Sequence, residues 1–294
     1  MPVFVILHYL SAEMTCRCVD TLRKTFAGQN YHIVIVENGS PNQSGAVLQE
    51  TYGALDTCTV LCSAENLGFA RGNNLGYTYA REQLGADYVI VMNNDVLIDD
   101  PDFLEKIRKI HHETGYFVLG PDIYACNADH HQNPMRATGY TQAQVEHIIS
   151  TRKRWLAVYP LHFFYERVLW GAKSVVKKLI GKKSKPLTNP LARLDRLEDP
   201  VLHGACYIFS KDFLEVRQEA FHSGTFLYFE EDILHYECLK NGYRMVYDSS
   251  LCVTHLEDVS TNTAYRSEYR KRKMKYRNLI RSASVLLRLM EQDQ

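Results

Sequence analysis

The residues best suited to chemistry in this sequence follow a short apolar run, Tyr88 to Met92. The run has the length and β-branched content of a buried parallel strand, and it stops at Asn93, Asn94 and Asp95. In open α/β sheets, ligands bind at the carboxyl ends of the strands. A carboxylate there can hold a hard divalent cation, and the cation can neutralise a diphosphate. The alternative is a turn that only ends the strand.

A second group of carboxylates, Glu230 to Asp232, stands where a helical pattern begins, behind the aromatic run Phe226 to Phe229, which predicts a strand. Acids at a helix start are well explained as residues that satisfy the helix dipole. The same position favours the ionised form of a carboxylate, which is the form that a general base requires. A lone histidine, His255, follows a late apolar run, and such a residue is usually structural.

Three glycines, at positions 68, 72 and 76, open a helix that extends to about Leu84. Each glycine inside a helix costs about 1 kcal/mol against alanine, so a reason for their presence is expected. A helix start without side-chain bulk offers backbone N–H groups to an anion or a flat base. The alternative is close packing against another backbone.

Alternating strands and helices must position these groups. Strands are predicted at residues 3–7, 31–36, 58–62, 88–92, 116–119, 203–209, 244–247 and 251–254. Helices are predicted at residues 13–26, with Ser11 as a cap, and at 45–52, 66–84, 101–113, 230–240 and 265–290. This alternation of strands and helices is typical of a parallel sheet with right-handed crossovers. The strand at residues 203–209 is expected to close a pocket from beneath.

The residues that follow the first strand count against two classes of nucleotide-binding enzyme. A dehydrogenase would have G-x-G-x-x-G there, and a sugar-nucleotide pyrophosphorylase would have a basic, glycine-rich loop. The sequence instead continues with His8, Tyr9, Leu10 and Ser11. The second strand ends at Glu37, an acid that could accept hydrogen bonds from a ribose or a base, or simply face solvent.

Residues 151–185 form a basic segment with ten Lys or Arg and one acid, although the whole chain has a formal net charge of zero. Aromatic and apolar residues are interleaved with these cations, among them Trp155, Phe163, Phe164, Leu169 and Trp170. Such a stretch is typical of a membrane-surface element. It could also be a core-packing insertion with a solvated basic face or, in the absence of a nucleic-acid-binding motif, a nucleic-acid patch as the least favoured reading.

Composition places the chain among globular α/β proteins, because 46% of its residues are hydrophobic. The eight cysteines show no metal-type spacing, so we expect reduced thiols in a cytosolic protein. No signal peptide and no apolar run of about 18 residues are present, so neither usual secretion nor membrane spanning is expected.

Several of these features together resemble glycosyltransferase family 2, the inverting enzymes with the nucleotide-sugar-binding GT-A fold. They are the immediate first strand, the acid-Asn turn at Glu37, the pattern N-x-G-F-A-x-G-x-N-x-G from Asn66 to Gly76, and Asn94-Asp95 about twenty residues further on. The acids before the late helix and the late His255 complete the likeness, which covers most of the chain. Two departures stand out: Glu37 replaces the more usual Asp, and Asn93 replaces the first acid of the D-x-D motif.

The resemblance implies a role for specific residues. The nucleotide sugar would be bound by His8, Tyr9, Glu37, Asn66, Gly68, Phe69, Arg71, Asn74, Asn94 and Asp95. Asp95 and His255 would hold Mg²⁺ or Mn²⁺. Asp232 would be the catalytic base, with Glu231 as the neighbouring candidate.

The predicted fold is therefore a GT-A-type α/β domain over residues 1–294, with a mostly parallel sheet flanked by helices. Within it we expect a nucleotide-binding half (1–120), a helical basic insertion (121–200), an acceptor and catalytic half (201–262) and a C-terminal helix (263–294). The expected reaction moves a sugar, with inversion, from a UDP-, dTDP- or GDP-linked donor to a saccharide or lipid-linked acceptor.

The likeness is to enzymes of bacterial surface polysaccharides, of rhamnosyltransferase-like type. We expect a cytoplasmic protein, peripheral on the inner face of the membrane, with no nucleic-acid partner. The alternatives are a non-catalytic membrane-surface scaffold with the same fold, which the missing first acid favours, and a sugar-nucleotide pyrophosphorylase.

Overall fold

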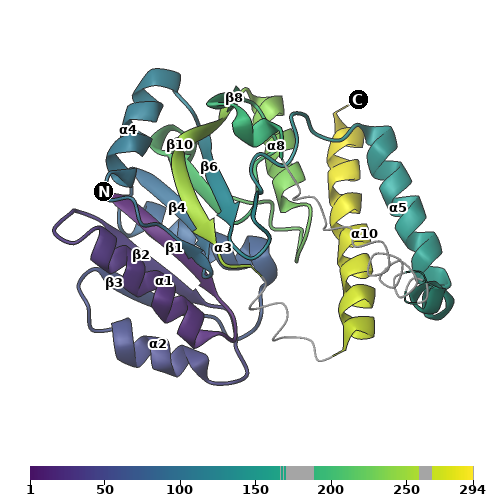
Figure 1. Cartoon of the computed structure of the whole chain (residues 1–294), viewed down its shortest axis with the longest axis horizontal. Helices are drawn as coiled ribbons and strands as arrows, with labels where there is room; N and C mark the ends of the chain where they lie inside the picture. The colour runs from purple at the N-terminus through teal and green to yellow at the C-terminus, as the bar shows by residue number, and fades with distance from the viewer. Residues whose placement is uncertain (166, 168, 170–188, 258–266, 294) are drawn as a thin grey trace, which may run out of the picture.

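Ten strands form one mixed sheet, with helices on both of its faces, in the computed structural model of the chain (Figure 1). The structure describes residues 1–165, 167, 169, 189–257 and 267–293. The strands are β1 (Pro2–His8), β2 (His32–Glu37), β3 (Cys58–Cys62), β4 (Tyr88–Asn93), β5 (Val96–Leu97), β6 (Val118–Ala125), β7 (His130–His131), β8 (Arg196–Glu198), β9 (Cys206–Ser210) and β10 (Met245–His255).

The helices connect these strands and cover them. They are α1 (Ala12–Thr25), α2 (Ser44–Tyr52), α3 (Gly68–Glu82), α4 (Phe103–Thr114), α5 (Gln142–Ala157), α7 (Lys211–Val216), α8 (Glu230–Asn241), α10 (Glu268–Gln292) and a 3₁₀ turn, η1 (Leu191–Arg193).

The main order of the sheet is β3-β2-β1-β4-β9-β6-β10-β5, with β7 paired to β6 and β8 paired to β10. Strands β1 to β4 pair in parallel, as the alternation of strands and helices predicted. β9 runs antiparallel between β4 and β6, and β6 pairs in parallel with β10. The sheet is therefore parallel where the first half of the chain builds it and mixed beyond β4.

Two apolar layers hold the sheet, one on each face. Alternate residues of β1 point to opposite faces: Phe4 and Ile6 enter the layer under α1 and α4, while Val3 and Val5 enter the layer with α3 and α7. Because both faces are covered, these strands are continuous apolar runs rather than alternating ones. Their carboxyl ends lie at one edge of the sheet, and that edge positions the polar residues that follow each strand.

Three expectations about local structure are wrong. Residues 226–229 form bends rather than a strand, and both Tyr228 and Phe229 have positive φ angles, of 74° and 69°. The two late strands are one strand, β10, with an irregular register between Asp248 and Cys252. Ser11 stands at the N-cap position of α1, but its side chain makes no capping hydrogen bond.

Helices α5 and α10 lie side by side at one end of the molecule, and α10 also packs on α8 (Figure 1). Apolar residues that include Ile149, Phe229, Ile233 and Leu286 join the three helices in a third cluster. Trp170 and the basic residues 171–185 lie outside the described residues, so the structure describes only the first part of the basic segment. Among the described helices, none combines the length and apolar content needed to cross a bilayer.

Candidate functional site

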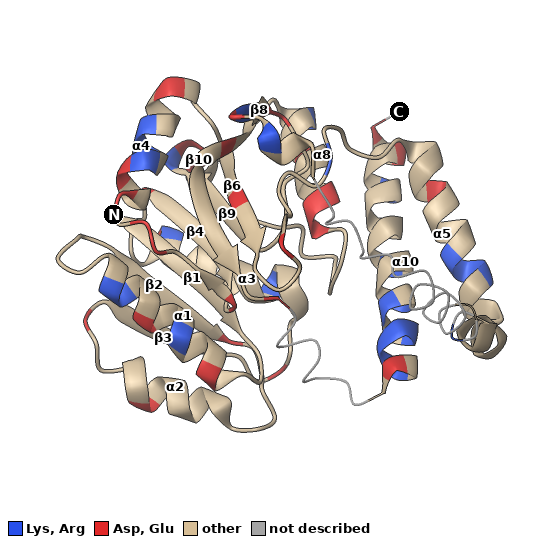
Figure 2. Cartoon of the chain, viewed as in Figure 1, with Lys and Arg blue, Asp and Glu red and all other residues tan. Residues whose placement is uncertain are grey.

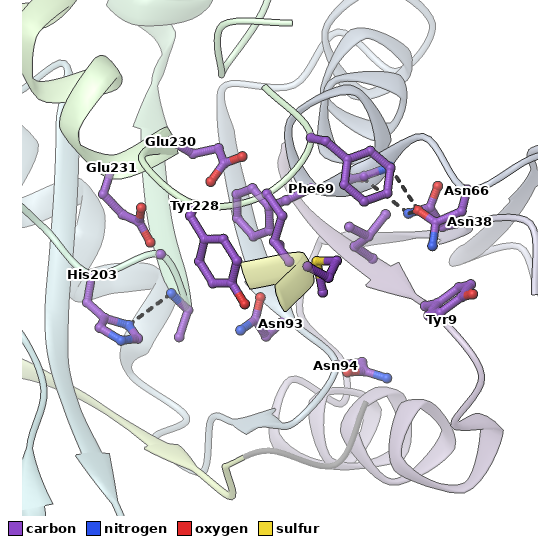
Figure 3. A pocket seen from close by; sticks show the side chains of 17 residues that line it. Tyr9, Asn38, Asn66, Phe69, Asn93, Asn94, His203, Tyr228, Glu230 and Glu231 are labelled. Atoms are coloured by element: carbon purple, nitrogen blue, oxygen red, sulfur yellow. Dashed lines mark hydrogen bonds between the residues drawn. The ribbon is translucent and has the colours of Figure 1, made fainter. Parts of the chain in front are cut away.

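A cavity of about 420 Å³ opens at the carboxyl ends of β1, β2 and β4 (Figure 3). Five parts of the chain form its wall: the strand ends, the start of α3, the segment before β9, the loop and first turn of α8, and α10 through Met274. The lining residues are Leu7, Tyr9, Asn38, Asn66, Gly68, Phe69, Asn93, Asn94, His203, Gly204, Ala205, Phe226, Leu227, Tyr228, Glu230, Glu231 and Met274. The cavity thus brings together six predicted site residues: Tyr9, Asn66, Gly68, Phe69, Asn94 and Glu231.

The start of α3 is not a free anion site, contrary to the expectation from its glycines. The backbone N–H of Leu67 donates to Asn38 Oδ1 at 2.8 Å, that of Gly68 to Asn66 Oδ1 at 2.9 Å, and that of Phe69 to the carbonyl of Phe226 at 2.8 Å. The groups that a phosphate would use are therefore already bonded within the protein.

Close packing accounts for the three glycines. Gly68 has a φ of +79°, and a Cβ there would lie 2.3 Å from the carbonyl oxygen of Phe226. A Cβ on Gly72 would lie 2.7 Å from Leu7 Cδ1, and one on Gly76 would lie 2.4 Å from Val5 Cγ1. The packing alternative is thus the one that the geometry supports, because α3 lies against β1 with no room for a methyl group.

Besides Asp95, four of the predicted nucleotide-binding residues lie outside the cavity wall. His8 is fully buried between Thr15 Oγ1 and Ser44 Oγ, each at 2.8 Å, and burial lowers its pKa to about 4. The Glu37 carboxylate accepts the N–H of Ser40 at 2.6 Å and that of Gly39 at 3.3 Å. It therefore bonds to its own turn.

The other two residues of this group are on α3. The amide of Asn74 brackets the backbone of Phe221, donating to its carbonyl at 2.7 Å and accepting its N–H at 2.9 Å. Arg71 is exposed and is not among the cavity residues. His8, Glu37 and Asn74 are thus occupied by the protein itself, whatever contacts a ligand adds.

Asp95 and His255 meet beside the cavity, where β10 pairs with β5. His255 Nε2 lies 3.3 Å from Asp95 Oδ1, and both side chains are buried. On its other side, His255 Nδ1 donates to Gln132 Oε1 at 2.7 Å, and Gln132 Nε2 donates to Glu257 Oε1 at 2.7 Å. This chain fixes the orientation of the imidazole and turns Nε2 toward the carboxylate.

This pair has the chemistry of a partial metal site. Two electron-pair donors face one point, and an outer hydrogen bond orients the histidine, as is usual for metal-ligating histidines. Among the described residues, no cluster of three or more His, Cys, Asp or Glu side chains is placed to hold a metal ion. The Asp95 carboxylate and His255 Nε2 therefore fit a cation that takes its remaining ligands from a diphosphate and water, as Mg²⁺ commonly does in proteins.

Glu230 and Glu231 form the acidic wall of the cavity, at the first turn of α8 (Figure 3). Burial raises the pKa of Glu231 to about 7 and that of Glu230 to about 8, and each carboxyl is disfavoured in its ionised form by the acid next to it. Glu231 lies against Gly204, where a Cβ would come within 2.6 Å of its Oε1. Glu230 is 4% exposed, and its Oε1 has no hydrogen-bond partner among the described residues.

The third acid, Asp232, points away from this wall and is not among the residues that line the cavity. It forms an ion pair with Arg136, whose guanidinium stacks on the Tyr140 ring at 4.0 Å. Burial raises the pKa of Asp232 to about 6, and Arg136 opposes that shift. Of the two predicted catalytic residues, only Glu231 lines the cavity, because the Asp232 carboxylate is paired with Arg136.

Sequence reasoning missed several residues of the wall. Asn38 directly follows β2 and Asn93 ends β4; the sequence placed Asn93 among the side chains suited to chemistry but assigned neither residue to the nucleotide site. Tyr228 and Glu230 were assigned to a strand and to a dipole-satisfying helix start, so their position in the wall was not foreseen. Met274 gave no signal, because it comes from α10 and only tertiary packing brings that helix to the cavity.

A cavity with carboxyl and amide side chains at the carboxyl ends of parallel strands defines an α/β protein that binds a ligand at the edge of its sheet. The chain belongs to glycosyl transferase family 2, since the model of that family matches residues 3–217. The mixed sheet with helices on both faces is accordingly the GT-A fold of these enzymes, and glycosyl transfer is the class of reaction that the family assigns.

One curated relative extends this comparison. Residues of this chain are 30% identical, over 119 positions, to a protein of Haloferax volcanii named low-salt glycan biosynthesis hexosyltransferase Agl10. The match covers 40% of this chain and 35% of that protein, so the chain spans about a third of the relative's length. It supports glycosyl transfer and leaves the sugar, the acceptor and the linkage to be proposed.

Proposed function

We propose that the protein transfers a sugar, with inversion, from a nucleotide-diphosphate donor to a hydroxyl of a saccharide or lipid-linked saccharide. The observation that carries this proposal is the half-buried carboxylate of Glu231, which faces the strand-end amides across the cavity (Figure 3). A donor and an acceptor bound between these two walls would meet at that carboxylate. The relative's name supports glycan synthesis as the setting.

The donor binds on the strand-end side in this proposal. Tyr9 and Phe69 offer ring surfaces for the base and ribose, with Asn38 and Asn66 between them as hydrogen-bonding amides. The diphosphate lies toward Asn93 and Asn94, where β4 ends. UDP-, dTDP- and GDP-sugars share this chemistry.

Asp95 and His255 would hold Mg²⁺ or Mn²⁺ next to the diphosphate. When bound, the cation supplies positive charge that offsets the negative charge building on the leaving group. The protein's own contribution is orientation, because Gln132 fixes the imidazole of His255 and thereby the direction of Nε2.

Glu231 is the general base of the proposed reaction, in place of Asp232. Its raised pKa of about 7 keeps a useful fraction ionised near neutral pH, and a base is most effective when its pKa lies near the working pH. One displacement at the anomeric carbon inverts that centre, so a single carboxylate is sufficient; two-step retention requires a second one as nucleophile.

The setting we propose is the cytoplasmic face of a membrane, in the synthesis of a surface polysaccharide. A lipid-linked acceptor would be presented there, and the basic helix α10 reaches the cavity through Met274. The enzyme is peripheral in this proposal.

Thermal shifts against a panel of UDP-, GDP- and dTDP-sugars, with Mn²⁺ and with chelator, test the proposal. A ligand at about 100 times its Kd stabilises the folded state by about 2.7 kcal/mol, so one family of donors should raise the melting temperature clearly. Slow hydrolysis of that donor by wild-type protein, and its loss in Glu231→Gln, would separate the enzyme from a non-catalytic scaffold. If no nucleotide sugar shifts the melting temperature with metal present, the proposal fails.

A further inference from the structure

The helical residues that follow α5 have two chemically different faces. After a turn at Val158, residues 159–165 are helical and lie beside the first turns of α10. On the inner face, Tyr159 and Phe163 pack their rings on Tyr269, with centroids 4.8 and 5.1 Å apart. The Tyr159 hydroxyl also donates to the carbonyl of Tyr269 at 3.0 Å. This face is an ordinary helix–helix contact.

The outer face is apolar and exposed. Val158, Leu161, Phe164 and Tyr165 are 51%, 73%, 69% and 61% exposed, and together they cover about two turns. Elsewhere in the described chain, large exposed apolar side chains stand on separate elements, such as Val47 on α2 and Val216 on α7. Single residues of that kind are normal on protein surfaces, whereas a contiguous group marks an interaction site.

Cations surround this outer face. Lys153 and Arg154 precede it on α5, and Arg270 is exposed on the facing turn of α10. Figure 2 shows that Lys and Arg gather on the N-terminal half of α10 and on the C-terminal half of α5. None of these three cations forms an ion pair with an acid in the described chain. Apolar side chains beside unpaired cations match a layer of anionic headgroups over acyl chains.

We propose that the outer face of residues 158–165 docks on an anionic lipid bilayer, with Leu161 and Phe164 entering the acyl boundary and Lys153, Arg154 and Arg270 contacting the headgroups. A second copy of the chain fits this face less well, since a symmetric contact would bring the same cations together. A nucleic acid would use the cations but leave the aliphatic side chains without a partner.

Docking also orients the cavity. Met274 lines the cavity and lies one turn after Arg270 on α10, about 6 Å along the helix axis. Lys275, the next residue, sits over the ring of Tyr228 in the cavity wall at 5.5 Å. The docked helix pair thus holds the cavity next to the headgroup layer, where a lipid-linked acceptor carries its saccharide. This last step rests on the proposed function, whereas docking itself does not.

Co-sedimentation of the full chain with vesicles tests the proposal. We compare phosphatidylcholine vesicles with vesicles that also contain phosphatidylglycerol, at rising salt, for wild type, for Leu161→Asp/Phe164→Asp and for the control Val47→Asp/Val216→Asp. The control places the same charges at two other exposed apolar side chains, which lie on α2 and α7 away from the face. We expect wild type and control to bind the anionic vesicles at low salt, and the double variant to lose about tenfold or more in affinity.

Three results would overturn the proposal. Wild type could fail to bind anionic vesicles at low salt, it could bind neutral vesicles equally well, or both double variants could lose binding to the same extent. Sedimentation velocity without vesicles tests whether a second copy of the chain occupies this face instead. A wild-type dimer that becomes monomeric in Leu161→Asp/Phe164→Asp would assign the face to self-association. Melting temperatures check that each variant is folded, and donor hydrolysis without vesicles reports the proposed function separately from docking.

Discussion

The two walls of the cavity differ in how their polar groups are satisfied. On the strand-end wall, and directly behind it, Asn38, Asn66 and Glu37 bond to neighbouring backbone groups, and His8 bonds to two hydroxyls. On the α8 wall, Glu230 is buried and Glu231 is half-buried, and Glu230 Oε1 has no partner in the described chain. Native proteins rarely leave buried polar atoms unpaired without a functional reason.

This difference separates two kinds of contribution. The strand-end wall has the properties of a preformed frame, because its groups are held whether or not a ligand is bound. The α8 wall has those of a reactive surface, since burial disfavours the ionised form of its carboxyls and Glu230 Oε1, without a partner among the described residues, can accept a hydrogen bond from a ligand. The five predictions below ask whether changes on the two walls affect different measured quantities.

The largest effect is expected from Glu231→Gln, which keeps size but removes the base. Turnover should fall by a factor of about 10² to 10⁴, with donor binding nearly unchanged. Asp232→Asn is the matched control, because Asp232 contacts Arg136 outside the cavity, and it should lower turnover by less than about tenfold. Single-turnover kinetics with the donor identified by thermal shift would measure both. If Asp232→Asn lowered turnover more than Glu231→Gln does, Asp232 would be the general base.

The same assignment predicts the direction of the pH dependence. Glu231 must be ionised to accept a proton, and its pKa is raised to about 7. Turnover should therefore rise as pH increases through about 7 and level off above it. Glu231→Gln should remove this rise from the residual activity, while Asp232→Asn should keep it.

Asp95→Ala should weaken metal-dependent donor binding by roughly 10- to 100-fold, an effect typical of lost metal ligands or their supports. Gln132→Ala tests the same geometry from one step away, because it frees the imidazole of His255 without removing a ligand. Titration calorimetry with Mn²⁺ and with chelator gives both affinities. Equal wild-type affinity in the two conditions would remove the metal from the mechanism.

On the frame side, Glu37→Gln should lower stability more than turnover. The charged carboxylate accepts two backbone N–H groups, and hydrogen bonds to charged groups contribute about 1.5–3 kcal/mol. Denaturant unfolding measures the loss, and kinetics at saturating donor should stay within about threefold of wild type. A large drop in turnover with unchanged stability would place Glu37 among the reacting groups. The strand-end wall would then not be a preformed frame that differs from the reactive α8 wall.

The smallest effect is a gain in stability. Burial raises the pKa of Glu230 from 4.5 to about 8, so the folded state holds its proton more tightly than the unfolded state. The contribution of the bound proton to the stability of the folded state is fully present below the pKa that Glu230 has in the unfolded chain. It is lost as the pH rises through the pKa of Glu230 in the folded protein. Glu230→Gln stays neutral throughout, so it should melt roughly 2–4 °C above wild type at about pH 8.5.

The control for this prediction is the same pair of proteins at about pH 4.5, where the two melting temperatures should nearly coincide. Scanning calorimetry at both values measures the difference. A variant that melts below wild type at the higher pH would mean that the Glu230 carboxylate is stabilised by partners in the folded protein.

The sequence alone determined the parallel half of the fold. The runs at residues 3–7, 31–36 and 88–92 are apolar because both faces of the sheet are covered, and strands of this length and composition leave few other structures. The same rule placed Tyr9 and Asn94 at the correct edge, since residues that directly follow parallel strands end at one side of a sheet.

Tertiary structure decided which acid faces the cavity and what the glycines do. Glu231 and Asp232 are neighbours on one helix, and only the placement of α8 against Gly204 and Arg136 decides which carboxyl points inward. Likewise, a glycine is equally compatible with a ligand or with a neighbouring strand until the helix is packed.

The two faces of residues 158–165 show the same limit. Aromatic residues interleaved with cations fit both a core contact and a membrane surface, and the sequence left those alternatives open. The packing of Tyr159 and Phe163 on Tyr269 assigned one set to the core and left Leu161 and Phe164 outside. Which side of a helix is covered depends on contacts with residues more than a hundred positions away, and no local pattern carries that information.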